Sequence, residues 1–360
     1  MHDSPRALVY RPGSLGDTLM SLPAVAHLRR QYPEHRLTLL TESESPGRVS
    51  PWTILKETGW FDTVHFYVVK PASAADRWHN LALAMRLRRI GYHDIFSLAP
   101  PRTVRQLRVD SGIFRGVVGT RGYHAAREPA WPVAVGAHRA HVEHEALRLL
   151  RIVDPNATGD LLGDFRLAVP DTERAMARGL LNDLGVRPDQ VLVGLGPGSG
   201  RSSTTWPAER FAAVGRALLR QFRNVVLLAI GGSSERTLCH ELCTAWGPRS
   251  HNLAGRLSVF GSASMLSQCA TYIGNDSGPT HLAAMVGIPC VAIFSARNAP
   301  GQWEPLGQNH IVLEDRPECA GCMLDDCVAE ANKCLTRIQI GRVVREAISL
   351  LESRAPCLAL

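Results

Sequence analysis

A short apolar run, a glycine-containing turn and an amphipathic helix follow one another near the start of the chain. Residues 7–10 are apolar, residues 11–17 form the turn, residues 18–32 have helical periodicity, and a second apolar run covers residues 37–41. A strand, a turn, a helix and a strand in this order are the building block of a parallel sheet with helices on its faces. The first half of the chain therefore favours an α/β fold.

The same pattern returns after a turn-rich segment at residues 154–171, where five further apolar runs of strand length alternate with helical segments. Ligands of open α/β sheets bind beyond the carboxyl ends of the strands. We therefore predict an α/β fold with two Rossmann-like domains that face each other across a cleft. The predicted boundaries are residues 1–160 for an N-terminal domain, residues 170–335 for a C-terminal domain, and residues 336–360 for a C-terminal helix and tail.

Composition places the 360 residues among ordinary globular proteins. The apolar fraction is 45%, the charged fraction is 20%, and the mean hydropathy is −0.05. These values exclude a disordered chain, a coiled coil and a collagen-like fibre. No apolar run approaches the roughly 20 residues that span a bilayer, and no apolar segment of a secretory signal follows the first residues. We expect a cytoplasmic protein.

Positive charges exceed negative charges by +7, and almost all of the basic residues are arginine. A GC-rich genome explains the preference for arginine over lysine more simply than selection for bidentate phosphate binding does. The net charge itself favours phosphorylated substrates and peripheral contact with the anionic inner face of the cytoplasmic membrane. Nucleic acid is not an expected partner, because no basic run is interleaved with aromatic residues and no zinc-finger or helix-turn-helix spacing occurs.

The most informative segment is residues 274–284, which follows a predicted strand and begins a predicted helix. Ser277 suits the N-cap of that helix, and Pro279 suits its first turn. The free N–H groups of such a turn and the helix dipole favour a bound phosphate. A phosphate would repel Asp276, so this carboxylate is better explained by hydrogen bonds to sugar hydroxyls. A capped structural helix with no ligand explains the same residues about equally well.

Two further strand-to-helix turns in this half contain glycines that let a ligand approach the backbone. Residues 194–201 follow one strand, and Arg201 at their end could reach a diphosphate. Residues 231–235 follow another strand, and Glu235 could bind ribose hydroxyls or simply favour the first turn of its helix. The glycines match neither a P-loop nor a dinucleotide-binding fingerprint.

Asp17 ends the first turn of the chain, directly before the predicted helix at residues 18–32. A carboxylate at this position could take a proton from an incoming hydroxyl group. The alternative is an aspartate that only caps the helix, which the sequence favours slightly.

Together these segments resemble glycosyltransferase family 9, the bacterial lipopolysaccharide heptosyltransferases, over residues 7–351. Four motifs in the same order make the resemblance specific. They are residues 13–17 with Pro23; residues 197–200 with Trp206 and Pro207; residues 276–283; and residues 287–289 with Phe294.

The resemblance implies a GT-B fold, in which the N-terminal domain binds an acceptor and the C-terminal domain binds an ADP-sugar. Transfer would invert the anomeric centre and need no catalytic metal. Asp17 matches the general base, the turn at residues 277–281 matches the diphosphate site, and Asp276 matches a contact to the donor sugar. The predicted donor-binding residues are Ser199, Arg201, Thr205, Glu235, Asp276, Ser277, Gly278, Pro279, Thr280 and His281. Arg11, Ser14 and Gly16 are predicted to form the acceptor-side loop.

One position departs from the family pattern. Many relatives have a lysine directly before the Trp-Pro pair, where it supports the phosphates, and this chain has Thr205. Arg201, four residues upstream, is the candidate replacement. The same departure is what a non-catalytic member of the fold would show.

Four cysteines lie within sixteen residues near the end of the second half. The cluster consists of Cys319, Cys322, Cys327 and Cys334. Four thiolates can hold one Zn²⁺ or iron ion tetrahedrally, and crowded cysteines in a cytosolic chain indicate a metal more often than disulfides. We expect either a structural metal or free or redox-active thiols here, and no catalytic role.

Arg102, Arg105 and Arg108 recur every three residues. They could bind acceptor phosphates, although a solvated helix face explains them more simply.

The function that the resemblance implies is transfer of a heptose from an ADP-sugar to a lipopolysaccharide inner-core acceptor, which is a phosphorylated, lipid-linked saccharide. Alternatives are a different nucleotide-sugar, a protein acceptor, or a nucleotide-binding homologue without activity. A nucleotide-dependent oxidoreductase is a further alternative, although no matching glycine fingerprint with a distant acid supports it.

Overall fold

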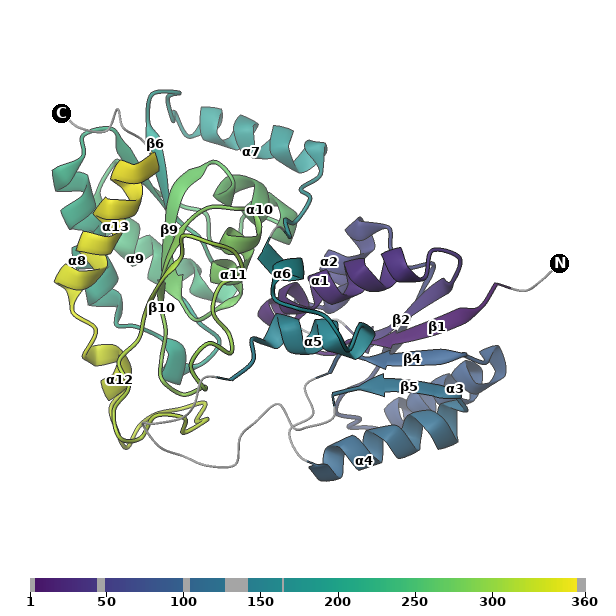
Figure 1. Cartoon of the computed structure of the whole chain (residues 1–360). Coiled ribbons are helices and arrows are strands. Elements are labelled where there is room, and N and C mark those ends of the chain that lie inside the picture. Colours follow the sequence, from purple (N-terminus) through teal and green to yellow (C-terminus); the bar gives the residue numbers. More distant parts are fainter. Residues whose placement is uncertain (1–3, 44–48, 100–103, 127–141, 164, 355–360) are drawn as a thin grey trace. The chain divides into compact units, whose positions relative to one another are not determined.

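The computed structural model describes residues 4–43, 49–99, 104–126, 142–163 and 165–354. The chain divides into two compact units (Figure 1). Unit 1 comprises residues 1–133 and 144–162, and unit 2 comprises residues 134–143 and 163–360. Both are built from parallel strands covered by helices, which confirms the predicted α/β class and its two Rossmann-like units.

Unit 1 contains a five-stranded parallel sheet in the order β3-β2-β1-β4-β5. The order reverses between β1 and β4, so the loops after these two strands diverge to opposite faces at that point. The strands are β1 (Arg6–Tyr10), β2 (Arg36–Glu42), β3 (Thr63–Tyr67), β4 (Asp94–Ser97) and β5 (Gly122–Ala125). Residues 120–141 were predicted to be irregular, but β5 lies at their start. It was not predicted, because its four residues show no alternation of apolar and polar side chains.

Helices cover both faces of this sheet. One face carries α1 (Leu15–Gln31), which packs against α2 (Pro51–Leu55) and α5 (Glu145–Val153). The other face carries α3 (Ala74–Ile90) and the π-helix η2 (Ile113–Val118), which continues α4 (Val104–Gly112). Buried Leu87 of α3 and buried Phe114 and Val118 of η2 pack with Leu8 of β1 in one core cluster. Arg102 lies outside the described residues.

Helix α1 begins at Leu15, three residues before the predicted start. Its N-cap is Ser14, whose backbone N–H and Oγ both donate to Oδ2 of Asp17, at 2.7 and 2.6 Å. A carboxylate at the third helical position that reaches back to the N-cap stabilises the first turn. Asp17 therefore belongs to the helix and not to the loop before it.

Unit 2 contains a six-stranded parallel sheet in the order β11-β10-β9-β6-β7-β8. The strand order reverses between β6 and β9. The strands are β6 (Val191–Gly196), β7 (Val225–Ala229), β8 (Ser250–Asn252), β9 (Cys269–Asn275), β10 (Cys290–Ile293) and β11 (Ile311–Leu313). Strand β8 was not predicted, because an edge strand of three polar residues carries no hydrophobic pattern.

Two helical layers enclose this sheet. On one face, α8 (Ala208–Gln221) packs against α9 (Arg236–Trp246) and the C-terminal helix α13 (Ile340–Arg354), with Trp206 fully buried in the same core. Helices α10 (Val259–Leu266) and α11 (Gly278–Met285) pack together, and α7 (Asp171–Asp183) lies against α10. The remaining short helices of this unit include η3 (Ser202–Thr204), η4 (Ser233–Glu235) and α12 (Lys333–Thr336).

No helix among the described residues is both long and apolar enough to cross a bilayer.

Candidate functional site

The carboxyl ends of β10, β9 and β6 lie next to one another in unit 2. Ile293 of β10 pairs with Asn275 of β9, and Gly196 of β6 pairs with Gly274 of β9. The loops that follow these strands therefore leave the same edge of the sheet side by side. Because the strand order reverses between β6 and β9, this edge is where an open α/β sheet binds its ligand.

The N-terminus of α11 lies directly after β9, at this edge. Ser277 is the extended N-cap residue, and its Oγ is buried without a hydrogen-bond partner among the described residues. Pro279 lies in the first turn, where its missing N–H removes no intrahelical bond. An unpaired buried hydroxyl beside the free N–H groups of a helix N-terminus is suited to a phosphate.

Asp276 is held next to this turn. Its backbone N–H donates to the carbonyl of Ile293, and its Oδ1 lies 4.0 Å from Nε2 of His281. His281 is nearly inaccessible, and its ring packs edge-on against Phe294, whereas the Asp276 side chain keeps 12% of its surface exposed. The carboxylate is therefore positioned by the protein and still reachable by a ligand.

A buried amide joins the loop after β6 to the end of β9. Nδ2 of Asn275 donates to the carbonyl of Pro197 at 2.7 Å, and its Oδ1 accepts from the backbone N–H of Trp206 at 3.0 Å. Asn275 is fully buried, so loss of either bond would leave a buried polar group unpaired. It fixes the glycine-rich loop relative to α11, a role that the sequence analysis did not assign.

Glu235 reaches the glycine-rich loop from the neighbouring strand end. Its Oε2 accepts from the backbone N–H of Gly232 at 2.6 Å. A Cβ atom added at Gly198 would overlap Oε1 of Glu235, so only glycine leaves room for this carboxylate. Burial raises the pKa of Glu235, and the bond from Gly232 opposes that shift. Two separately predicted turns are thus brought together by one side chain.

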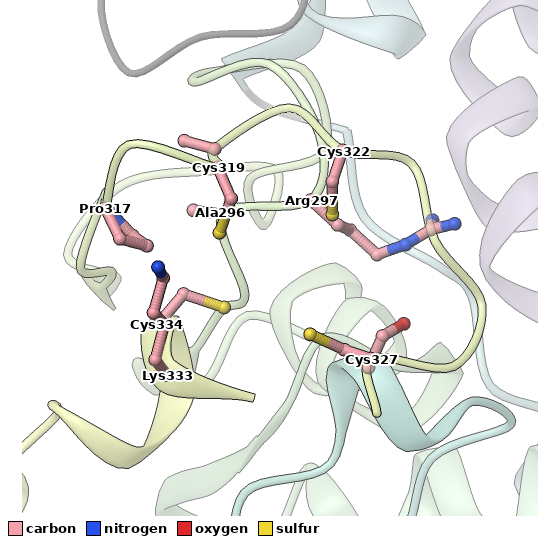
Figure 2. Close-up of a pocket in the computed structure, with 10 residues that line it drawn as sticks. Ala296, Arg297, Pro317, Cys319, Cys322, Cys327, Lys333 and Cys334 are labelled. Carbon is pink, nitrogen blue, oxygen red and sulfur yellow. The ribbon is translucent and has the colours of Figure 1, made fainter. Parts of the chain in front are cut away.

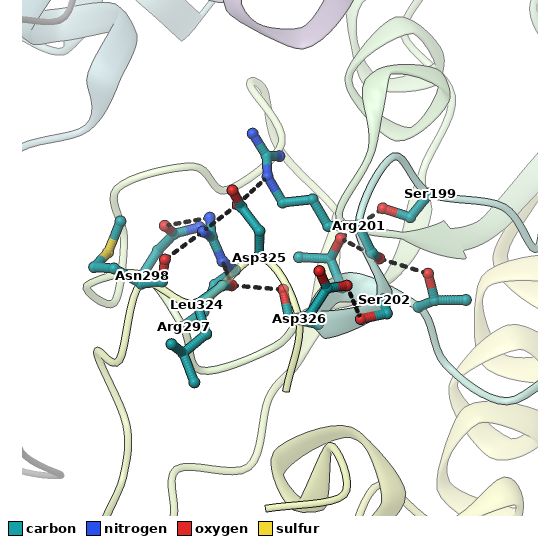
Figure 3. Close-up of polar contacts among 12 residues, drawn as sticks. Ser199, Arg201, Ser202, Arg297, Asn298, Leu324, Asp325 and Asp326 are labelled. Carbon is teal, nitrogen blue, oxygen red and sulfur yellow. Dashed lines mark hydrogen bonds and ion pairs between the residues drawn. The ribbon is translucent and has the colours of Figure 1, made fainter. Parts of the chain in front are cut away.

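Two arginines, one from each of the loops that follow the strands beside β9, contact the same carboxylate (Figure 3). Arg201, from the loop after β6, places its Nε 2.7 Å from Oδ1 of Asp325. Arg297, from the loop after β10, places its Nη2 3.1 Å from the same oxygen and is almost fully buried. Burial lowers the pKa of Arg297, Arg201 lowers it further, and Asp325 and Asp276 oppose the shift. The loops that follow the two strands flanking β9 therefore each place one guanidinium group on Asp325.

Arg297 and Asp325 were not among the predicted site residues. Arg297 could have been found, since it follows a predicted strand and such residues lie at the binding edge of the sheet. Asp325 could not, because its contact with Arg201 spans 124 residues of chain.

The segment around Asp325 also fastens the loop that contains Arg201. Ser202 Oγ donates to Oδ1 of Asp326 at 2.6 Å, and Ser203 Oγ donates to the carbonyl of Leu324 at 2.7 Å (Figure 3). Within the loop, the hydroxyls of Ser199 and Thr204 lie 2.5 Å apart, and Thr205 donates to the carbonyl of Arg201 at 2.7 Å. Thr205 therefore supports the loop backbone, and Arg201 is the basic residue of this loop.

The four predicted metal ligands line one small pocket beside this segment (Figure 2). None of these cysteines forms a disulfide. Burial raises the pKa of the Cys334 and Cys319 thiols, which favours the protonated forms. Four sulfur donors suit Zn²⁺ or iron, but within the described part of the chain no three His, Cys, Asp or Glu side chains are close enough to hold a metal ion. The four thiols are therefore suitable metal ligands by their chemistry, but their sulfur atoms are not arranged around a common metal position in this structure.

Unit 1 presents its own polar group at the carboxyl ends of its strands. Asp17 is partly exposed at the start of α1. Gly13 has φ +128, and a Cβ there would lie 2.7 Å from Cβ of Asp17, so glycine is needed for both conformation and space. The Gly13 N–H donates to the buried carboxylate of Glu42 at 2.6 Å. The turn is thus built tightly around Asp17.

Arg11 and the remaining predicted acceptor-side residues have different surroundings. Arg11 is 1% exposed, and its Nη1 donates to the carbonyl of Leu98, at the end of the neighbouring strand β4. Burial lowers its pKa, and the Asp17 carboxylate is the strongest opposing charge. Arg11 is therefore a buried cation that interacts with the charge of Asp17. Ser14 is exposed, and Gly16 is partly exposed.

Two Rossmann-like units, each with a parallel sheet covered by helices, define the GT-B fold class. A family model described as glycosyltransferase family 9 (heptosyltransferase) matches residues 136–332. The chain belongs to this family.

Individual relatives are distant. The lipooligosaccharide heptosyltransferase 2 of Campylobacter jejuni is 26% identical over 219 residues, which are 59% of this chain and 65% of that protein, slightly less than two thirds of its length. A family 9 glycosyltransferase from Veillonella parvula has a TM-score of 0.74 at 19% identity, covering 98% of this chain and 99% of that one. TibC of enterotoxigenic Escherichia coli, an iron-containing heptosyltransferase solved with ADP-D-beta-D-heptose, has a TM-score of 0.55 at 14% identity, covering 98% of this chain and 77% of that one.

Proposed function

We propose that this chain is an inverting glycosyltransferase that transfers a heptose from an ADP-sugar to a lipopolysaccharide inner-core acceptor. The observation that carries the proposal is the buried, unpartnered hydroxyl of Ser277 at the N-terminus of α11, at the edge of the sheet where the loops after β6 and β10 carry Arg201 and Arg297. Family membership and the solved relative with bound ADP-heptose support this choice of donor.

In the proposed donor site, the diphosphate lies on the first turn of α11. Ser277 and the helix N–H groups hydrogen-bond to its oxygens, and Arg201 neutralises part of its charge. Glu235 accepts hydrogen bonds from the ribose hydroxyls, and Asp276 from the hydroxyls of the sugar. Negative charge grows on the diphosphate as the sugar leaves, so the same donors stabilise the transition state more than the ground state.

In the proposed reaction, the carboxylate of Asp17 removes the proton from the acceptor hydroxyl. That oxygen forms a bond to the anomeric carbon while the bond from this carbon to the ADP oxygen breaks, which inverts the centre. The proton ends on Asp17, and the electron pair leaves with ADP. No metal is needed in these steps, because charge on the leaving group is met by Ser277, Arg201 and the helix dipole.

Activity and donor choice are tested together with purified protein. ADP-heptose, other nucleotide-sugars and nicotinamide cofactors are titrated in a thermal-shift assay, and transfer is followed on an inner-core acceptor that lacks heptose. We expect stabilisation and transfer with ADP-heptose. Asp276→Ala should weaken use of the donor sugar more than binding of free ADP, and an equal loss of both would remove its sugar contact. Binding without transfer or donor hydrolysis would indicate a non-catalytic homologue.

The proposed acceptor is a phosphorylated, lipid-linked saccharide, and this determines where the protein works. The chain has a net charge of +7, which favours a phosphorylated acceptor and the anionic inner face of the cytoplasmic membrane. We propose that the protein is cytoplasmic and contacts this face peripherally. Cell fractionation at low and high ionic strength tests this: membrane-bound protein that is released by salt supports it.

We also propose that the four cysteines hold a structural Zn²⁺ or iron ion when the metal is supplied. Support comes from four free thiols around one pocket and from the iron of the related TibC. Binding would require the thiols to move together and lose their protons. Metal analysis of protein purified without chelator tests the proposal: about one equivalent of metal that is lost in Cys322→Ser supports it. Metal-free protein with wild-type stability contradicts it.

A further inference from the structure

Exposed apolar side chains gather on one part of unit 1. Eleven large apolar side chains are exposed among the described residues, and seven of them lie between residues 69 and 117. Isolated exposed apolar residues are normal on a protein surface, but a contiguous group indicates a binding surface. Six of the seven are Trp78, Leu81, Met85, Val109, Ile113 and Val117.

Their spacing places them in two stripes. Trp78, Leu81 and Met85 are three and four residues apart on α3, which puts them on one face of that helix. The opposite face of α3 holds Leu87, which packs into the core. Val109, Ile113 and Val117 are four residues apart along α4 and η2. Each element therefore buries one apolar face and leaves a second apolar face uncovered.

The two stripes are neighbours. Nη1 of Arg88 on α3 donates to the carbonyl of Gly116 on η2 and lies 3.4 Å from the carbonyl of Val117. Leu87 on α3 and Phe114 on η2 share one core cluster below the surface. Both elements contribute to the core cluster that contains Leu8 of β1, so they cover the same face of the unit 1 sheet. Figure 1 shows α3 and α4, the helix that η2 continues, on this face. The two elements thus lie side by side, and we call the part of their exposed surface that carries both stripes the α3–η2 surface.

Arginines border this surface. Residues 74–90 and 104–118 contain seven arginines and two acidic residues. One acid, Asp76, caps the start of α3, and the other, Asp110, is partly buried. The exposed arginines on these elements are Arg77, Arg86, Arg88, Arg89, Arg105, Arg108 and Arg115. Long arginine side chains can lie along an apolar stripe while their guanidinium groups reach a layer of phosphates.

We infer that the α3–η2 surface docks on an anionic phospholipid bilayer, with its two apolar stripes in the headgroup region and its arginines on lipid phosphates. An apolar stripe with a tryptophan and a basic border is the pattern of an interfacial helix. A second copy of the chain fits less well, because a symmetric contact would place the arginine borders of both copies against each other. The inference deepens the proposed function, since it names the surface through which the enzyme would meet a lipid-linked acceptor.

Vesicle co-sedimentation of the full chain tests the inference. Wild-type protein is expected to bind vesicles of phosphatidylcholine with phosphatidylglycerol, to bind pure phosphatidylcholine more weakly, and to be released by salt. Met85→Glu and Ile113→Glu should each weaken binding at least about fivefold, because a carboxylate would enter the apolar stripe and face anionic lipid. Met176→Glu is the matched control: Met176 is an exposed methionine on helix α7 of unit 2, outside the α3–η2 surface.

Unchanged vesicle binding in both glutamate variants would overturn the inference. So would a wild-type protein that binds no vesicles but forms a dimer that Met85→Glu dissociates, because the occupant would then be a second copy. Transfer to a delipidated, water-soluble acceptor separates this test from the proposed function. We expect Met85→Glu to retain transfer to this soluble acceptor. If wild-type protein does not transfer heptose to it, the proposed function is contradicted, and vesicle binding alone then decides whether the α3–η2 surface docks on a bilayer.

Discussion

Asp325 forms an ion pair with Arg201 across 124 residues of chain, with 2.7 Å between Oδ1 and Nε. The same oxygen also accepts from Arg297. If the diphosphate of the proposed donor binds these guanidinium groups, it must displace the carboxylate from them. We therefore predict that Asp325 competes with the donor for the two arginines.

Asp325→Asn should raise the affinity for ADP. The side chain of Asp325 is 73% exposed and that of Arg201 is 52% exposed, so solvent weakens the pair, and we expect a gain of only about two- to fivefold. Asp326→Asn is the matched control, because the neighbouring Asp326 bonds Ser202 and neither arginine. Isothermal titration with ADP measures both variants. A lower affinity in Asp325→Asn would show that Asp325 holds the arginines in place for the donor.

Gly198→Ala should disturb the donor site through Glu235. The added Cβ would overlap the Glu235 carboxylate, so this side chain or the loop must move. We expect ADP affinity to fall about tenfold, as for a lost hydrogen-bonded contact to the ribose. Gly200→Ala is the control, because a Cβ there meets no atom within 4 Å. Equal affinities in the two variants would place Glu235 outside the nucleotide site.

Glu235 should make nucleotide binding depend on pH. Burial raises its pKa, so the carboxylate takes up a proton at a higher pH than an exposed glutamate, whose pKa is about 4.3. The protonated group accepts ribose hydrogen bonds less well, and ADP affinity should therefore fall on acidification before that value is reached. Binding measured between about pH 5 and 8 should show this decline in wild-type protein and not in Glu235→Gln.

The raised pKa of Glu235 also makes the stability of the fold depend on pH, and in the opposite direction from ADP affinity. A raised pKa means that the folded chain binds this proton more tightly than the unfolded chain, so its contribution to stability is lost as the pH rises through the folded pKa. Relative to Glu235→Gln, wild-type protein should lose stability on going from acidic to neutral pH. A parallel change in both proteins would contradict the raised pKa.

Much of the fold follows from local sequence pattern. Apolar runs followed by glycine turns predicted most strands of both sheets, and Ser277 with Pro279 predicted the start of α11. The start of α1 was placed too late, although Ser14 and Asp17 have capping-box spacing. The polar strands β5 and β8 could not be predicted, because their place in the sheets is set by pairing with neighbouring strands.

The candidate site was predictable only where its residues follow strands. Asp276, Arg201 and Glu235 were identified in this way, because topology brings strand ends together. The pairing of Asp325 with Arg201 and the bridge made by Asn275 depend on contacts between distant segments. Arg11 was assigned to the acceptor loop, yet it is buried, and nothing in its local sequence indicates that burial.

Turnover of Asp17→Asn tests the account most directly. The variant keeps the size of the side chain and removes the proton acceptor, so we expect turnover to fall by about two to four orders of magnitude while the Kd for ADP stays unchanged. Asp76→Asn controls for loss of a helix cap, because Asp76 caps α3 as Asp17 caps α1. It should lower Tm slightly and leave turnover unchanged. Asp17→Asn protein that turns over at the wild-type rate would contradict the account.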